Sequence, residues 1–266
     1  MDFSLRDRYT VDDLVALMEL LRSEDGCPWD REQTHSSIRK NVIEEAYEVA
    51  DAIDKGDPIS LCEELGDLLL QVVFQSQMSR EEGTFTFDDV ADGICKKLVL
   101  RHPHIFSDVN ADGSQEVLNI WEEVKKKEKG QETATETLRA VPSSFPALMR
   151  SQKVQSRAAR TGFKYPDTSM VWETLRSEIE ELDMAVKEGN TDSCTEELGD
   201  VLFSVVQLSR MLDIDAEQAL QLSCDKFIGR FSVLEKLAQD KHISLGNAAV
   251  PQLLDLWREA KEKASK

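Results

Sequence analysis

The sequence predicts an all-α protein built from two repeats of one helical unit. Three observations support this fold class. A segment in the first half of the 266-residue chain recurs 133 positions later. Apolar residues recur at spacings of three and four, the period of a helix that buries one face. No stretch shows the sustained alternation of apolar and polar residues that a half-buried strand requires.

The repeat is clearest between residues 44–78 and 177–211, where 15 of 35 positions are identical at a constant offset of 133. Downstream of each block a basic pair and then a Trp–Lys pair follow in the same order, as Lys97/Arg101 and Trp121/Lys125 in the first half and as Lys226/Arg230 and Trp257/Lys261 in the second. Because the order of features is the same, we expect one structural unit to occur twice.

The repeat divides the chain into three predicted regions. Residues 1–125 form an N-terminal unit and residues 145–266 form a C-terminal unit. Between them, residues 126–144 are polar and charged and include Pro142, a composition typical of a linker. Each unit is long enough to bury a core of its own.

Within each repeat, two helices are expected to form an antiparallel hairpin. Between residues 65 and 76, apolar or small side chains recur at the spacing of a buried helix face. The helix before this stripe is expected to end near Gly56, or near Gly189 in the second repeat, because glycine commonly ends helices. Only a short polar turn follows, so the two helices must pack side by side.

The composition argues against several classes of protein. The longest apolar stretches are too short to cross a bilayer. The net charge of −19 repels phosphate backbones, so we expect no stable nucleic-acid binding. The N-terminus lacks a basic segment followed by an apolar run, which predicts a cytoplasmic protein without a secretory signal. Five cysteines without CxxC spacing argue against a disulfide framework or a zinc site.

The hairpin helices carry acidic residues beside the apolar stripe. Glu45 and Glu48 lie three residues apart on the first helix, as do Glu64 and Asp67 on the second, so each pair projects from one face. Packing would bring four carboxylates together, and they cannot all stay ionised without a cation. Mg²⁺ prefers such oxygen ligands. The sequence therefore predicts a magnesium site in each repeat, the second made of Glu178, Glu181, Glu197 and Asp200.

Two other interpretations of these carboxylates are weaker. Three-residue spacings of Glu are common on solvated helix faces, but their recurrence at one offset in both repeats favours a site. A di-iron carboxylate bundle needs an ExxH motif on each of two helices. Only Glu32 and His35 have that spacing.

Together these motifs resemble the MazG family of all-α nucleoside triphosphate pyrophosphohydrolases. The resemblance covers nearly the whole chain and rests on GCPWD at 26–30, EEAYE at 44–48, ELGD at 64–67, RHPHIF at 101–106 and a second repeat that ends in Trp257 and Lys261. It implies two helical-bundle units of the all-α NTP pyrophosphatase type. It also implies Mg²⁺-dependent hydrolysis of nucleoside triphosphates to nucleoside monophosphate and pyrophosphate by a protein that is usually a homodimer.

The family pattern, EExxE followed by ExxD, is complete in the first repeat, whereas the second has Ser177 in place of the first Glu. In two-repeat members the C-terminal unit is generally the active one. The resemblance therefore assigns the metal ligands to Glu178, Glu181, Glu197 and Asp200. The first repeat stays a second candidate metal site, made of Glu45, Glu48, Glu64 and Asp67.

The basic and aromatic pairs of the second repeat are candidates for holding the nucleotide. Lys226 and Arg230 share a helix face, as do Trp257 and Lys261. Cations would neutralise charge on phosphate oxygens, and an indole would stack on a base or close the site. A solvated basic edge and a core tryptophan are the structural alternatives. Our candidate catalytic residues are Glu178 as the base, Lys226, Arg230 and Lys261, and the candidate nucleotide-binding residues are Trp257, Lys226 and Arg230.

The resemblance therefore implies an NTP pyrophosphohydrolase, which we expect to accept a broad range of bases. One alternative is a non-catalytic acidic helical scaffold or regulatory protein that binds a partner through its charged faces. Another is a pyrophosphatase restricted to modified or deoxy nucleotides. Sequence does not separate these substrates, because base selectivity depends on the shape of the pocket.

Overall fold

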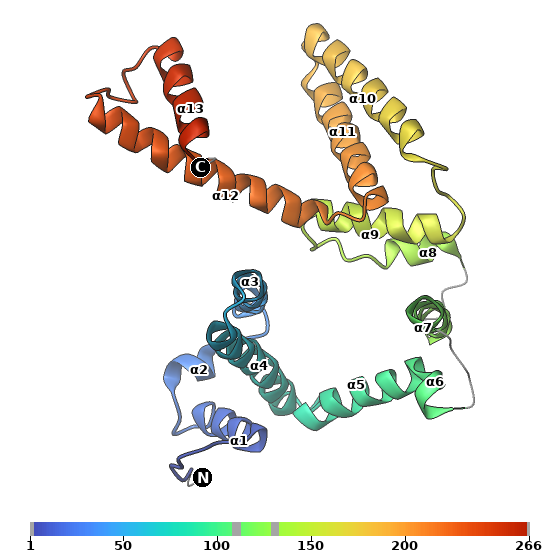
Figure 1. Ribbon diagram of the computed structural model, residues 1–266. Helices are drawn as coiled ribbons and strands as arrows, with labels where there is room; N and C mark the ends of the chain where they lie inside the picture. Colours follow the sequence, from blue (N-terminus) through green and yellow to red (C-terminus); the bar gives the residue numbers. More distant parts are fainter. Residues whose placement is uncertain (1–2, 108–112, 129–132, 265–266) are drawn as a thin grey trace. The chain divides into compact units, whose positions relative to one another are not determined.

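The computed structural model describes residues 3–107, 113–128 and 133–264, and each regular element in these ranges is a helix (Figure 1). The predicted all-α fold class is confirmed. The chain divides into two compact units, Met1–Lys125 (unit 1) and Lys126–Lys266 (unit 2). Within the described ranges, none of the helices is both long enough and apolar enough to span a membrane.

Unit 1 is organised around a long helical hairpin. Its helices in chain order are α1 (Val11–Leu21), α2 (Pro28–Glu32), α3 (Arg39–Lys55), α4 (Pro58–Glu81), α5 (Phe87–Arg101), α6 (Pro103–Phe106) and the beginning of α7 (Ser114–Glu128). Helices α3 and α4 pack on each other along the hairpin, and α1 packs on α4.

The turn between α3 and α4 has the chemistry that the sequence predicted. Gly56 ends α3 with φ of +66°, a left-handed conformation that glycine adopts without strain. Asp57 then caps α4, because its Oδ1 accepts a hydrogen bond from the Ile59 backbone N–H at 3.0 Å. Pro58 occupies the first turn of α4, where its missing N–H costs nothing.

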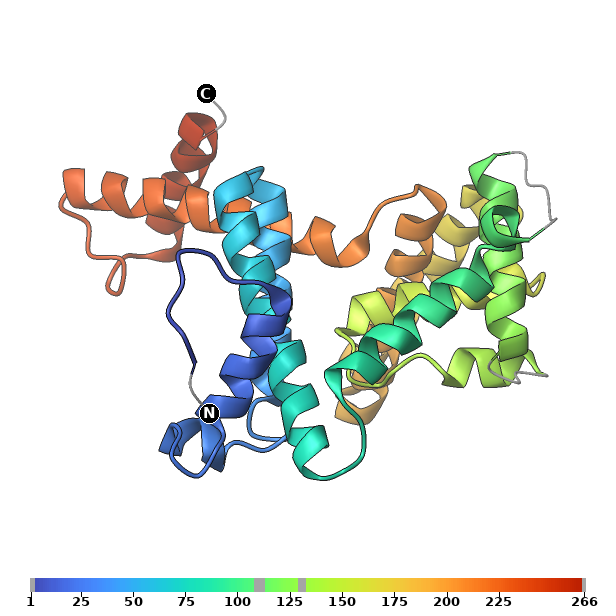
Figure 2. The ribbon, with the colours of Figure 1, turned by 90° about the horizontal axis from the view of Figure 1, so that it is seen from below.

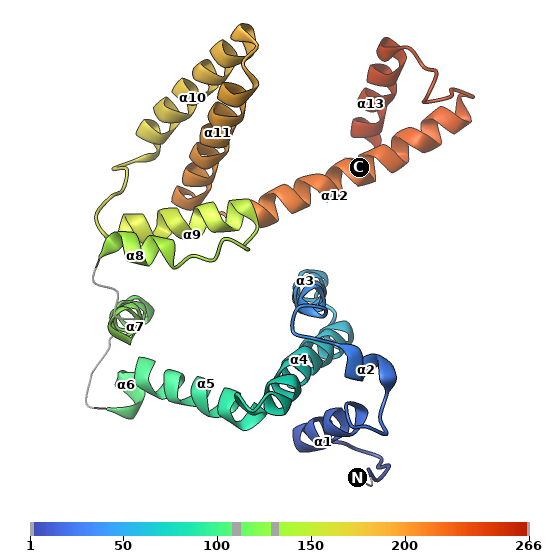
Figure 3. The same cartoon turned by 180° about the vertical axis from the view of Figure 1, so that it is seen from behind.

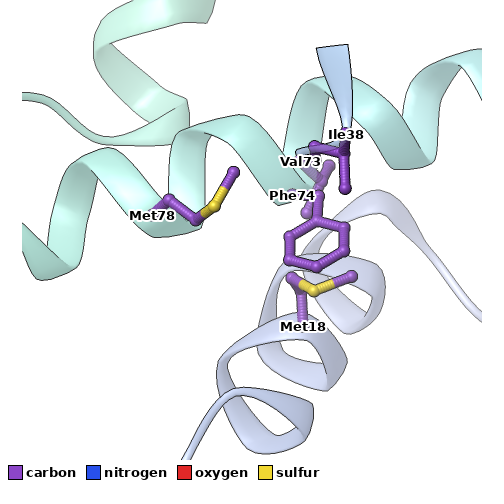
Figure 4. Close-up of a cluster of buried hydrophobic side chains, with 5 residues drawn as sticks. All are labelled: Met18, Ile38, Val73, Phe74 and Met78. Carbon is purple, nitrogen blue, oxygen red and sulfur yellow. The ribbon is translucent and has the colours of Figure 1, made fainter. Parts of the chain in front are cut away.

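The core of unit 1 lies where α1, α4 and the start of α3 meet (Figure 4). Its buried members are Met18, Ile38, Val73, Phe74 and Met78. The Arg22 guanidinium lies over the Phe74 ring at 5.4 Å and also pairs with Glu81 at 2.7 Å. These contacts fix α1 against the C-terminal half of α4.

Only part of the predicted apolar stripe of α4 is buried. Val73 and Ser76 are buried, whereas Leu65 and Val72 are 48% and 39% exposed. The stripe is wider than the surface that α1 and α3 cover, so the hairpin keeps an uncovered apolar flank.

Unit 2 repeats the hairpin and adds a second one. Its helices are α8 (Ala134–Arg139), α9 (Ala147–Arg160), α10 (Thr168–Glu188), α11 (Thr191–Met211), α12 (Ala216–Asp240) and α13 (Val250–Ala264). Gly189 ends α10 with φ of +70°, and Asn190 caps α11 by accepting a hydrogen bond from the Asp192 backbone N–H at 3.1 Å. The predicted linker, residues 126–144, contains α8, which packs on α9.

The two hairpins of unit 2 are joined through α9. Helix α9 contacts α11 and the beginning of α12, where Gln152 Oε1 accepts a hydrogen bond from the Ala216 backbone N–H at 3.1 Å. Helix α13 packs on the C-terminal half of α12 around a core of Leu234, Leu237, Ala238, Leu256 and Ala260. The ribbon views agree that α13 lies at the opposite end of α12 from the α10–α11 hairpin (Figure 1, Figure 2 and Figure 3).

Candidate metal centre

The α10–α11 hairpin brings predicted carboxylates of the second repeat together. Glu178 comes from α10, and Glu197 and Asp200 come from α11. Each offers one carboxylate oxygen, and these three oxygens lie within 4.8 Å of one another. Mg²⁺ binds oxygen at about 2.0–2.1 Å, so a single cation could reach oxygens at this separation after small side-chain adjustments.

Glu181, the fourth predicted ligand of this group, stands beside the other three. Its Oε1 accepts a hydrogen bond from the Ser177 hydroxyl at 3.1 Å. Its charge also contributes to raising the pKa of Glu178 and of Glu197. Ser177, which replaces the first Glu of the family pattern, therefore orients a neighbouring carboxylate. We call Glu178, Glu181, Glu197 and Asp200 the second cluster.

The first repeat assembles an equivalent group between α3 and α4. Carboxylate oxygens of Glu45, Glu48 and Glu64 lie within 4.8 Å of one another. Asp67 is close enough for its charge to help raise the pKa of Glu45. These four residues form the first cluster. The structure thus brings together the carboxylates of both predicted sites, while their assignment as ligands stays a prediction.

Both clusters concentrate negative charge. Partial removal from water, followed by repulsion from Glu181, Asp200 and Glu197, raises the pKa of Glu178 above the 4.5 of an ordinary glutamate. The same two causes raise the pKa of Glu197, and they raise the pKa of Glu45 and Glu64 in the first cluster. Within the described ranges, no Lys, Arg or His forms an ion pair with a carboxylate of either cluster. Charge, donor type and spacing therefore fit a hard divalent cation.

Arg101, one member of the basic pair of the first repeat, meets the Trp121/Lys125 pair in unit 1. The Arg101 guanidinium lies 4.9 Å from the centre of the Trp121 ring, and the Lys125 ammonium lies 4.5 Å from the same centre. Arg101 is buried, so little of its guanidinium at this contact is exposed to water. Cation–π contacts of this kind hold Arg101 and Lys125 against the ring.

The corresponding residues of the second repeat gather on the α12–α13 hairpin. Trp257 is half-buried, and its ring centre lies 5.2 Å from that of Phe227 on α12. Lys226 and Lys261 are exposed, and Arg230 is half-buried. In unit 2 this hairpin extends away from α10 and α11 (Figure 1). The second cluster and its predicted nucleotide-binding residues therefore lie on separate hairpins of the chain.

A cavity that the sequence did not indicate lies beside the second cluster. It measures about 320 Å³ and is lined by residues of α9, α10 and α11 and by residues 163–165. Helix α9 lies outside the conspicuous repeat blocks, so the pattern of identities gave no reason to place it against the hairpin. The one available signal is a difference inside the repeat, where Phe74 of the first block is answered by Gln207 of the second.

An all-helical chain with a carboxylate cluster on each of two repeated hairpins defines a narrow class of proteins, and comparison identifies the family. The model of the MazG nucleotide pyrophosphohydrolase domain matches residues 33–106 and again residues 167–232. The chain therefore belongs to the MazG nucleotide pyrophosphohydrolase family. The predicted enzyme class is confirmed. The α3–α4 and α10–α11 hairpins lie within the matched segments, whereas α9 and α13 lie outside them.

Three relatives extend the likeness over nearly the whole chain. The nucleoside triphosphate pyrophosphohydrolase of Escherichia coli strain K12 is 41% identical over 95% of this chain and 97% of that protein. The nucleoside triphosphate pyrophosphohydrolase/pyrophosphatase MazG of Thermotoga maritima is 39% identical over 94% and 95%. The uncharacterised protein YabN of Bacillus subtilis strain 168 is 41% identical over 93% of this chain but only 50% of that longer protein.

The raised pKa values predict how protons and metal compete for the second cluster. A raised carboxyl pKa means that the folded protein holds the proton more tightly than the unfolded chain, so this stabilisation is lost as the pH rises through that pKa. Added Mg²⁺ should then raise Tm at pH 7.5, by about 5 °C at a hundred times its Kd, and should lose this effect as the pH falls towards 4.5. Scanning fluorimetry in EDTA and in Mg²⁺ measures both.

Neutral variants sharpen this measurement. Glu178→Gln with Glu197→Gln should raise Tm of the metal-free protein at neutral pH, because it removes like-charge repulsion, and should reduce the response to Mg²⁺ to what the first cluster contributes. Glu180→Gln, an exposed position on the same helix, serves as the control. An equal Mg²⁺ response in the double variant and the unaltered protein would contradict the site.

Proposed function

We propose that this protein hydrolyses nucleoside triphosphates to nucleoside monophosphate and pyrophosphate in a Mg²⁺-dependent reaction at the second cluster. One observation carries the proposal. Oxygens from three carboxylates on two helices lie within 4.8 Å of one another, and no ion-paired basic side chain compensates them in the described ranges. The substrate is taken from the two relatives that are named nucleoside triphosphate pyrophosphohydrolases. Acceptance of a broad range of bases is part of the proposal.

Each carboxylate has a defined part in this reaction. Glu178, Glu181, Glu197 and Asp200 would hold Mg²⁺. A bound Mg²⁺ ion supplies a contact to phosphate oxygens and a coordinated water of lowered pKa. Glu178 is our candidate for the general base, because its half-buried carboxylate on α10 faces the two carboxylates of α11. Attack at the α-phosphorus would release pyrophosphate.

The cations that this chemistry needs would come from a second copy of the chain. Lys226, Arg230 and Lys261 lie on the α12–α13 hairpin, which extends away from α10 and α11 of the same chain. In a homodimer they would neutralise phosphate charge beside the other copy's carboxylates. Trp257 would then close the site.

Exposed apolar side chains support this dimer. Leu202 and Val205 on α11 are 48% and 41% exposed, and Phe227 and Ile228 on α12 are 55% and 64% exposed. Large apolar side chains that are left this exposed are common at interfaces between protein chains. Covering it gains about 25 cal/mol for each Å² removed from water.

Three further interpretations of the sequence concern a non-catalytic role, a narrower substrate range and the location of the protein. No feature of the described residues favours the non-catalytic scaffold, and membership of an enzyme family argues against it. Restriction to modified or deoxy nucleotides stays an untested alternative. Cytoplasmic location also stays a prediction.

The reaction and its location can be tested together. With ATP and Mg²⁺ the expected products are AMP and pyrophosphate, and ADP with phosphate would contradict the reaction. Glu197→Ala with Asp200→Ala should lower kcat about a hundredfold or more, because the cation site is lost. The matching change in the first cluster, Glu64→Ala with Asp67→Ala, should lower kcat by a factor at least about ten times smaller. The reverse order would assign catalysis to the first repeat.

Complementation tests whether the site is shared between two chains. Glu197→Ala removes a carboxylate, and Lys226→Ala with Arg230→Ala removes the cations, so each variant alone should be inactive. Co-expressed in equal amounts, they should form mixed dimers with one intact site, which gives about a quarter of the unaltered activity. Absence of any recovery, with mixed dimers shown to form, would place cations and carboxylates in one chain.

A further inference from the structure

The tryptophan of the Trp–Lys pair has different neighbours in the two repeats. In unit 1 the ring of Trp121 holds two cations, because the Arg101 guanidinium lies 4.9 Å and the Lys125 ammonium 4.5 Å from its centre. A cation held in this way is attracted by the electron-rich face of the ring and has to give up that contact when it binds a phosphate. The basic group and the indole therefore compete with a ligand in the first repeat.

In unit 2 an aromatic side chain stands next to the indole instead. The centre of the Trp257 ring lies 5.2 Å from that of Phe227, and the two planes are tilted by 44°. Phe227 is itself stacked on Phe231, four residues further along α12, with ring centres 6.0 Å apart. Among the described residues of this unit, the Arg230 guanidinium makes no cation–π contact with Trp257. The indole of the second repeat therefore packs against a ring where that of the first repeat holds an arginine.

The sequence accounts for this difference. The offset of 129 residues that relates the two basic pairs also relates Leu98 to Phe227 and His102 to Phe231. A leucine has no ring, whereas a phenylalanine packs against an indole in the tilted geometry that aromatic pairs prefer. The His102 ring lies beside that of His104, with centres 5.5 Å apart. The first repeat thus lacks the two phenylalanines that accompany the indole in the second.

Trp257 is held between Phe227 and a core. It packs against the buried cluster that joins α12 to α13. Arg230 stands three residues after Phe227 on α12, and residues three apart are neighbours on a helix surface. Without the Phe227 ring, the indole would therefore have the guanidinium within reach, as Trp121 has in the first repeat.

We propose that Phe227 is a positioning residue that keeps the Trp257 indole off the phosphate-binding guanidinium of Arg230. Its ring occupies the side of the indole that would otherwise attract the cation. Arg230 thereby stays available for a polyphosphate. This inference rests on the proposed function, in which Arg230 binds phosphate. It also gives a reason to expect weaker phosphate binding by the basic pair of the first repeat.

Phe227→Leu tests this role by installing the residue of the first repeat. Calorimetry with Mg²⁺ and inorganic tripolyphosphate, which has no base, measures phosphate binding alone. The variant should bind tripolyphosphate about three- to tenfold more weakly, because Arg230 must first leave the indole. Phe227→Tyr keeps a ring and should bind within about twofold of the unaltered protein. Phe85→Leu, at a position that is 43% exposed in unit 1, is the matched control and should change nothing.

Removal of the indole separates positioning from a general structural effect. In Phe227→Leu combined with Trp257→Leu, no indole remains to hold Arg230, so tripolyphosphate binding should recover relative to Phe227→Leu alone. A loss caused by disturbed packing of α12 on α13 would instead be deepened by the second change. Thermal melting and light scattering show that each variant folds and keeps the oligomeric state of the unaltered protein.

The outcomes separate the positioning role from the reaction. Equal tripolyphosphate binding by Phe227→Leu and the unaltered protein overturns the inference, as does an equal loss in Phe227→Tyr or a loss that persists without the indole. Unchanged binding in Lys226→Ala with Arg230→Ala also overturns it, because the basic pair then holds no phosphate. If tripolyphosphate binding follows the expected pattern but the unaltered protein releases no pyrophosphate from ATP, the positioning role stands and the proposed reaction fails.

Discussion

Repulsion between carboxylates held on adjacent helices is the constraint on which the function of this protein depends. A short turn ends α10 at Gly189 and caps α11 with Asn190, and it therefore fixes which residues of the two helices face each other. In that register Glu178 meets Asp200, and like charges stay close together at neutral pH. We therefore propose that a divalent cation binds here, because a cation would relieve repulsion that the folded chain otherwise has to tolerate.

The two repeats keep this charge arrangement but differ in the packing beside it. In unit 1 the Phe74 ring fills the space next to α1 and is itself covered by the Arg22 guanidinium. In unit 2 Gln207 takes the equivalent position, and a cavity remains. The first repeat thus fills this space with core side chains, whereas the second leaves a cavity beside the carboxylates. The difference is a structural reason to propose unequal roles for the two nearly symmetric clusters.

Local features of this fold could be predicted from the sequence, and longer-range ones could not. Helical spacing and glycine caps predicted the α3–α4 and α10–α11 hairpins. Residue spacing within them predicted that Glu45 lies close to Glu64. Exposure of Leu65 could not be foreseen, because it depends on how much of α4 its neighbours cover. Trp257 is separated from the carboxylates because of the direction that α12 takes after α11, and local sequence does not encode that direction. The cavity was missed because α9 supplies one wall from outside the repeat blocks.

Anomalous diffraction from a crystal containing Mn²⁺ and α,β-methylene-ATP would test the central claim most directly. Mn²⁺ replaces Mg²⁺ at oxygen sites and can be located without prior assumptions about its ligands. We expect an anomalous peak between α10 and α11, at about 2.2 Å from carboxylate oxygens of Glu178, Glu197 and Asp200. A peak only at Glu45, Glu48 and Glu64, or at neither cluster, would contradict the assignment of the catalytic cation to the second repeat.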